Sequence, residues 1–153
     1  MTSLKIDKNI KFQYKFYGHE YANIKPINKK YDKIKDLYDL YDVLNNIWSK
    51  ETCAPRMRKD WNINNKTLGQ CSITSFLVQD IFGGDVYGIK LDDGNFHCYN
   101  VINNLIFDLT KEQFNKPLNY DLKNQQFKEI HFKNEEKYQR YLLLKNRLEE
   151  YLK

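Results

Sequence analysis

The chain has 153 residues, of which 41% are hydrophobic, 15% aromatic and 29% charged. This much core-forming material excludes a disordered chain, and the length suits one domain. No apolar run reaches the roughly 18 to 20 residues that span a bilayer, and the N-terminus lacks the apolar segment of a signal peptide, so we expect a soluble cytoplasmic protein without a membrane partner.

The formal net charge of +5 is concentrated at the N-terminus, where residues 1–35 hold nine lysines and three acidic residues. We therefore predict a Lys-rich extension at 1–35 ahead of a single α+β domain at 36–153. A basic arm can contact nucleic-acid phosphates. The chain nevertheless uses Lys far more than Arg, the residue suited to bidentate phosphate recognition, so the composition argues against a nucleic-acid partner.

Apolar spacing predicts the first elements. Residues 10–17 alternate between apolar and polar positions, which favours a short strand. From Asp36 onward apolar residues recur at three- and four-residue spacing, so we expect a helix that ends before Pro55. Residues 50–70 are predicted to form a long loop that packs on the domain, because loops of this length are usually functional when they are ordered.

The pattern changes at Cys71, where one apolar face predicts a helix at 71–82 that stops at Gly83-Gly84. Alternating residues separated by turn residues then predict an antiparallel sheet. The elements expected after the helix are strands at 85–91, 95–102 and 105–109, a helical turn at 110–114, a strand at 126–132 and a helix from Asn134. The predicted fold class is therefore α+β, with the Cys-bearing helix packed on the sheet.

The three cysteines, Cys53, Cys71 and Cys98, fit neither a disulfide framework nor a zinc site, because their number is odd and no CxxC pair occurs. Cys71 opens the predicted helix, where the macrodipole favours a thiolate. His97 and Asp108 lie on the two strands that follow. An imidazole beside a thiol, oriented by a carboxylate, is the arrangement of Cys-His-Asp sites.

The predicted hairpin supports this grouping. If Asn103-Asn104 is a two-residue turn, His97 and Asp108 lie on one face of the sheet as diagonal neighbours. Each residue alone also has a structural explanation: an inert buried cysteine, a histidine with its hydrogen bonds satisfied, or an aspartate that caps a helical turn. Cys53 and Cys98 are predicted to be structural.

Four segments resemble the YunG-like family of small bacterial proteins over roughly residues 38–150: WSKETCAPRMRKDW, TLGQCSITSFLVQDIFGGDVYG, HCYNVINNLIFDLTKEQF and NEEKYQRYLLLKNRL. The resemblance assigns shared family positions to Trp61, Gly69, Gln70, Cys71, His97, Asn100, Asp108, Thr110 and Gln113. The order helix-Cys, strand-His, strand-Asp is also similar to the papain-like superfamily, in particular its transglutaminase-like branch. That similarity implies a papain-like core and acyl transfer through a thioester.

Two functions follow as hypotheses. The first is a cysteine-dependent acyl-transfer enzyme that acts on an amide, thioester or peptide without a cofactor or metal. Cys71 is its nucleophile, His97 its general base and acid, and Asp108 the group that orients the imidazole. Candidates for the oxyanion site and the cleft are Gln70, Trp61, Asn100 and Thr110. The alternative is a non-catalytic binding or interaction domain on the same fold.

Overall fold

A computed structural model describes residues 14–153. Most of the strand expected at 10–17 lies outside these residues, although Tyr17 forms an isolated antiparallel bridge with Asp108. The helices are α2 (Leu37–Ile47), α3 (Cys71–Phe82), α4 (Lys128–His131) and α5 (Glu135–Tyr151). The strands are β1 (Asp85–Lys90), β2 (Phe96–Ile102), β3 (Leu105–Phe107) and β4 (Asn124–Gln126).

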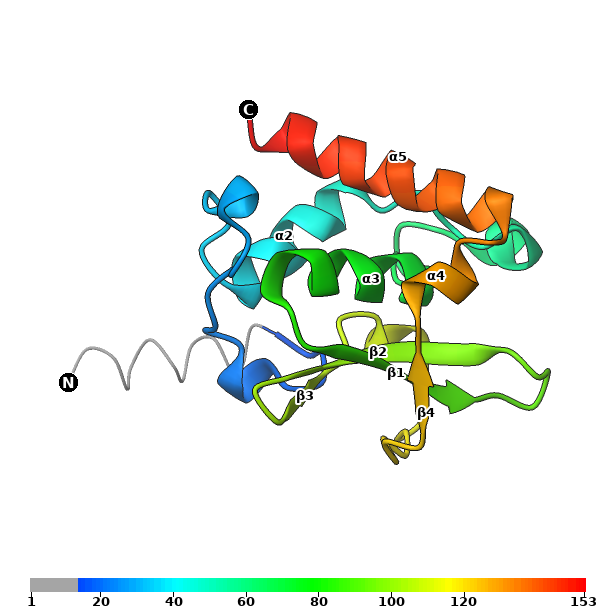
Figure 1. The fold of residues 1–153 in the computed structure, drawn as a ribbon. Coiled ribbons are helices and arrows are strands. Elements are labelled where there is room, and N and C mark those ends of the chain that lie inside the picture. The colour runs from blue at the N-terminus through cyan, green and yellow to red at the C-terminus, as the bar shows by residue number, and fades with distance from the viewer. Residues whose placement is uncertain (1–13) are drawn as a thin grey trace.

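The fold is α+β, with an antiparallel sheet of strand order β3-β2-β1-β4. Figure 1 shows the three long helices on one side of the sheet, with α3 between the sheet and α5. The apolar residues of α3 are fully buried: Ile73, Phe76, Leu77, Val78 and Ile81. Helix α3 therefore forms the centre of the core, and its first residue lies beside the start of β2.

The β2–β3 hairpin has the predicted register. Ile102 pairs with Leu105 and Asn100 with Phe107, so the turn consists of Asn103 and Asn104. Both asparagines have positive φ, of 53° and 65°, as a two-residue hairpin turn of the type I′ requires. This register places His97 and Asp108 on one face.

The strand predicted at 126–132 is wrong. Strand β4 ends at Gln126, and the chain then turns into the short helix α4. Backbone N–H groups of Ile130 and His131 both donate to the carbonyl of Phe127, which closes a helical turn. Phe127 and Ile130 are three residues apart, a spacing that suits a helix better than an alternating strand.

The segment before α2 contributes to the core. Five apolar side chains of this segment are buried: Tyr14, Phe16, Ala22, Tyr31 and Ile34. The ring of Phe16 packs against Tyr38 and Tyr41 of α2, with centroids 6.0 and 4.9 Å apart. Residues 14–34 are thus built into the domain, while the boundary expected at residue 36 stays a prediction.

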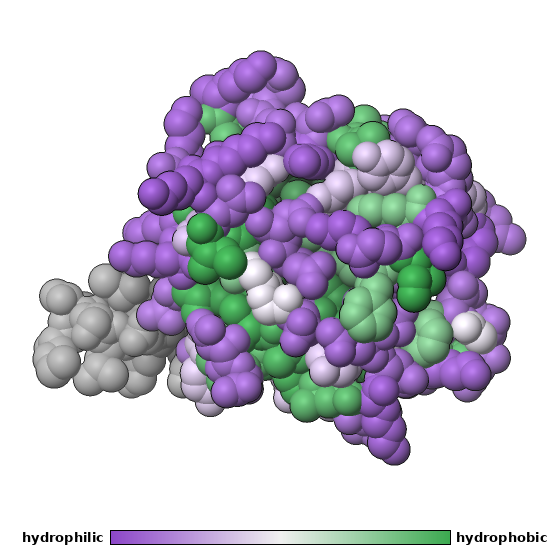
Figure 2. Space-filling model, viewed as in Figure 1, coloured by the Kyte–Doolittle hydropathy of each residue, from purple (hydrophilic) through white to green (hydrophobic). Residues whose placement is uncertain are grey.

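Residues 50–70 form an irregular segment that contains a 3-10 helix at Pro55–Asp60 and packs through Cys53, which is fully buried. Figure 2 shows that hydrophilic residues cover most of one face of the molecule, with apolar residues gathered toward the sheet. Among residues 14–153, no helix is both long and apolar enough to cross a membrane.

Candidate active site

Cys71 is the first residue of α3, and the chain before it is arranged to leave the helix end open. Gly69 has φ +72°, a conformation that glycine adopts without strain. Gln70 occupies the N-cap position without a side-chain hydrogen bond to the helix. The first-turn N–H groups of α3 therefore lack a side-chain cap and direct their partial positive charge at the Cys71 thiol, which is partly exposed.

His97 lies on β2 with its ring fully buried and fixed at one nitrogen. Its Nε2 is 2.6 Å from Oδ2 of Asp108. The carboxylate is held in turn by Thr110, whose backbone N–H donates to Oδ1 over 3.1 Å, and by the Tyr120 hydroxyl, which donates to Oδ2 over 2.8 Å. Asp108 is thus oriented from three sides, and it fixes both the tautomer and the plane of the imidazole.

The second nitrogen of His97 faces the thiol. Nδ1 is buried and has no hydrogen-bond partner among the described residues. The Cys71 sulfur lies beside the ring, 3.8 Å from the Phe96 carbonyl oxygen. Each group shifts the pKa of the other, although their contact falls short of hydrogen-bond geometry. This leaves Nδ1 as the atom available to exchange a proton with Cys71 or a substrate.

Both pKa shifts favour an ion pair. Contact with the Cys98 thiol, and then the neighbouring His97, hold the pKa of Cys71 well below its usual range despite burial. Burial by itself would lower the pKa of His97, but the carboxylate of Asp108 and the Cys71 sulfur outweigh it and raise the pKa to about 10. These directions favour a thiolate beside an imidazolium over the neutral pair.

Cys98 takes part in this arrangement, which the sequence did not reveal. Its side chain alternates with His97 along β2 and is fully buried, as expected of a structural cysteine. The thiol nevertheless reaches Cys71, and this contact raises the pKa of Cys98 while it lowers that of Cys71. The two shifts together favour the thiol form of Cys98 and the thiolate form of Cys71.

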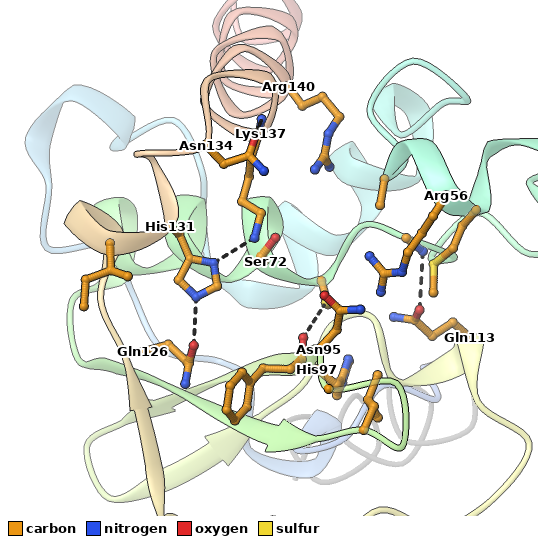
Figure 3. A pocket seen from close by; sticks show the side chains of 18 of the residues that line it. Arg56, Ser72, Asn95, His97, Gln113, Gln126, His131, Asn134, Lys137 and Arg140 are labelled. Atoms are coloured by element: carbon orange, nitrogen blue, oxygen red, sulfur yellow. Dashed lines mark hydrogen bonds between the residues drawn. The ribbon is translucent and has the colours of Figure 1, made fainter.

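A cavity of about 370 Å³ opens onto Cys71 and His97. Its walls come from the start of α3, the 3-10 helix at Pro55–Asp60, the β1–β2 end of the sheet and the first turns of α5. Figure 3 shows side chains of α5 and of the 50–70 segment reaching toward His97 from the opposite wall. The volume suits a small molecule or a short segment of a larger one.

The four residues predicted for the cleft or the oxyanion site lie behind the cavity and do not line it. The Gln70 amide donates to the Ser49 carbonyl, and the Trp61 indole donates to the Lys66 carbonyl, so each anchors the 50–70 segment. The Asn100 amide donates to the Ser75 carbonyl and ties β2 to α3. Thr110 supports Asp108.

Two lining residues escaped the sequence analysis. His131 accepts a hydrogen bond at Nδ1 from the Lys137 ammonium, 2.9 Å away, and its Nε2 contacts Oε1 of Gln126 at 2.8 Å. Burial and the Lys137 charge lower the pKa of His131 to about 4, so the ring is neutral and orients the lysine. No local motif marks this pair, because the two residues meet only where the chain turns between α4 and α5.

Among residues 14–153, no three His, Cys, Asp or Glu side chains are grouped so that they could hold a metal ion. The reactive groups of the site are the Cys71 thiol, the His97 imidazole and the buried Asp108 carboxylate. The fold and site define the class of protein: an α+β domain with a helix-borne cysteine facing a strand-borne histidine and aspartate.

Comparison with known proteins identifies the family of the chain. The model of the YunG protein family matches residues 36–153. The chain belongs to the YunG family. It is 33% identical over 78 residues to the uncharacterised protein YunG of Bacillus subtilis (strain 168), an alignment covering 51% of this chain and 63% of that protein. The alignment thus spans less than two thirds of the relative. No solved structure matches the chain.

Proposed function

We propose that this protein is a cysteine-dependent acyl-transfer enzyme acting on an amide or thioester. The observation that carries the proposal is the His97 ring, which is fixed by Asp108 at 2.6 Å on one nitrogen and left unpartnered toward Cys71 on the other. A structural histidine would have both nitrogens satisfied. The order of Cys, His and Asp along helix and strands also supports a kinship with papain-like and transglutaminase-like folds as part of the proposal.

In the first half of the reaction, the Cys71 thiolate attacks the substrate carbonyl carbon and forms a C–S bond. The tetrahedral intermediate collapses, the bond to the leaving amine or thiol breaks, and His97 delivers its Nδ1 proton to that group. The product is a thioester on Cys71. Asp108 stabilises the imidazolium beforehand, so the proton is in place when the leaving group departs.

In the second half, water or an amine attacks the thioester. The neutral His97 accepts a proton from the incoming nucleophile, the C–S bond breaks, and the thiolate–imidazolium pair is restored. The oxyanion of both intermediates faces the uncapped start of α3. The Cys71 N–H supplies one donor there, since no side chain caps the helix. The chemistry requires no electron transfer.

Acylation by a small activated thioester tests the proposal directly. We expect phenyl thioacetate to add one acetyl group to Cys71, detected by intact mass and peptide mapping, with little addition at Cys53 or Cys98. Cys71→Ser should abolish the addition and keep its melting temperature within a few degrees, because the change is nearly isosteric at a partly exposed helix start. Iodoacetamide at pH 7 should select the same thiol.

The competing hypothesis, a binding domain without catalysis, makes the opposite forecast. There Cys71 would react no faster than the two buried cysteines, and Cys71→Ser would melt clearly lower because a buried hydroxyl lacks partners. An unreactive parent with a destabilised variant would rule out the enzyme.

A further inference from the structure

The cavity that holds Cys71 is lined by three cationic side chains, Arg56, Lys137 and Arg140, and by no aspartate or glutamate among the described residues. A cavity of one sign concentrates ligands of the opposite sign. Arg56 stands at the exposed rim, where Asp93 lies 3.8 Å from it and offsets its charge. Lys137 and Arg140 carry the argument, because they lie deeper.

Both residues belong to one face of α5. Asn134, Lys137 and Arg140 follow at three-residue spacing from the N-cap onward, and all three line the cavity. Figure 3 shows them directed from α5 toward the start of α3. The positive ends of the α3 and α5 dipoles therefore face the cavity, and so do the charged side chains of Lys137 and Arg140.

Lys137 is held in place but not neutralised. One of its ammonium N–H groups donates to His131 Nδ1, and no carboxylate pairs with it among the described residues. The remaining two N–H groups are available to a ligand. The neutral His131, anchored to Gln126, thus acts as a rigid support that fixes the cation without cancelling it.

Arg140 is 94% buried, since its exposed fraction is 6%. Its Nε donates to Glu136 and its Nη1 to the Thr52 carbonyl. Within the described part of the chain, Nη2 has no hydrogen-bond partner. Glu136 does not line the cavity, but its carboxylate lies 2.7 Å from Nε and offsets the charge of Arg140. Arg140 therefore contributes the free Nη2 donors to the cavity, and Lys137 contributes the unpaired charge.

We infer that the cavity selects an acyl substrate bearing an anionic group, a carboxylate or a phosphate, close to the reacting carbonyl, and that Lys137 and Arg140 bind this group. The inference rests on the proposed function, because it assumes that the reacting carbonyl sits at Cys71. It adds a substrate class: small anionic amides or thioesters rather than neutral or cationic ones.

Two alkylating reagents of nearly the same size test the charge preference on the full chain. Iodoacetate is an anion and iodoacetamide is neutral, and both modify Cys71 at its sulfur. We expect the ratio of the two rate constants, iodoacetate over iodoacetamide, to exceed that of N-acetylcysteine at the same pH by about tenfold or more, as for a desolvated ion pair. Lys137→Met should bring the ratio back toward that of the free thiol.

Matched variants separate a local effect from a general one. Lys145→Met removes one positive charge from the same helix but outside the cavity, so it should leave the ratio unchanged. Lys137→Arg keeps the charge and should retain most of the preference. Arg140→Gln, which removes a charge from the cavity, provides a second reduction if Lys137→Met folds poorly. Protection of Cys71 by succinate assigns a carboxylate, and protection by inorganic phosphate assigns a phosphoryl group.

The two failures are distinguishable. If Cys71 reacts rapidly with iodoacetamide but its ratio equals that of N-acetylcysteine and does not respond to Lys137→Met, the anionic substrate class is refuted and the acyl-transfer proposal stands. If neither reagent modifies Cys71 faster than Cys53, the nucleophile itself is refuted, and this inference fails with it.

Discussion

The buried Cys98 thiol acts on the ionisation of Cys71. It is the largest influence that lowers the pKa of Cys71. A thiol that donates to a thiolate stabilises the charged form in the same way as an N–H at a helix end, only more weakly. Cys98 is therefore a positioning residue of the proposed nucleophile, although it lies in the core.

Cys98→Ala should raise the pKa of Cys71. The rate of Cys71 alkylation by iodoacetamide would then reach its plateau at a higher pH than in the wild type. Cys53→Ala is the matched control, since Cys53 is equally buried but packs against Gly69 rather than Cys71. If both variants gave the same rate profile as the wild type, the donor role of Cys98 would be excluded.

The pKa of His97 links the site to the pH dependence of stability. In the unfolded chain the imidazole has a pKa of about 6.5. In the folded protein Asp108 raises the pKa to about 10 against the effect of burial. The raised pKa stabilises the folded state fully below pH 6.5, and this stabilisation declines as pH rises and is gone above about 10.

Cys71 has the opposite dependence, so the test uses a Cys71→Ser background. We expect the difference in free energy of unfolding between Cys71→Ser and Cys71→Ser/His97→Gln to shrink as pH rises above about 6.5, as urea denaturation would measure. The decline should end below about 10, because the Cys71 sulfur that helps to raise the pKa of His97 is absent from this background. A difference that is constant across this range would mean that His97 is neutral in the fold.

At the scale of elements, the turn before α3 determines where Cys71 sits. The Gly69 carbonyl accepts from Ala54 N–H at 2.9 Å, and its N–H donates to Oε1 of Gln113 at 3.3 Å. A Cβ at this glycine would lie 2.5 Å from the Cys53 sulfur. The positive φ and the close approach together explain why glycine stands two residues before the cysteine.

Gly69→Ala should lower the free energy of unfolding by about 1 to 3 kcal/mol, the cost of left-handed strain plus overpacking. Cys71 reactivity should also fall, because the start of α3 would shift. Gly94→Ala is the control: its φ is similarly positive, but a Cβ there meets no atom within 4 Å. Equal losses of unfolding free energy in the two variants would show that the positive φ accounts for the effect and that packing against Cys53 does not.

The same elements show what the sequence could reveal about the fold and site. Alternation and the Asn103-Asn104 turn determine which residues share a face, so the His97–Asp108 pair could be predicted. The role of His131 could not be predicted, because it depends on where the short helix α4 places the ring after β4. The Phe127–Ile130 spacing suits a helix better than a strand, but the point where the strand ends is determined by the pairing of β4 with β1, which stops at Gln126.

At the scale of the whole molecule, the segment before α2 reaches the site through its backbone. Tyr17 and Asp108 exchange two backbone hydrogen bonds, of 3.3 and 3.0 Å. The ring of Tyr17 also stacks near Tyr120, which donates to the Asp108 carboxylate. A charge count could not reveal this, since it describes the segment as a basic arm and does not register the apolar residues between the lysines.

Phe16→Ala tests whether this segment is part of the domain. The side chain is fully buried and packs on α2, so its loss should cost about 3 to 5 kcal/mol of unfolding free energy. Tyr21→Ala, in the same segment but 59% exposed, should cost well under 1 kcal/mol. Urea denaturation of both variants gives the comparison.

The Phe16 variant should also lose part of the site, because Tyr17 holds the backbone of Asp108. We expect slower Cys71 alkylation at pH 7 under conditions where the variant remains folded, since a displaced carboxylate supports the imidazolium less and the thiolate pair weakens. If Phe16→Ala and Tyr21→Ala were equally stable and equally reactive, residues 14–35 would be an appendage, and the domain would begin at residue 36 as the sequence predicts.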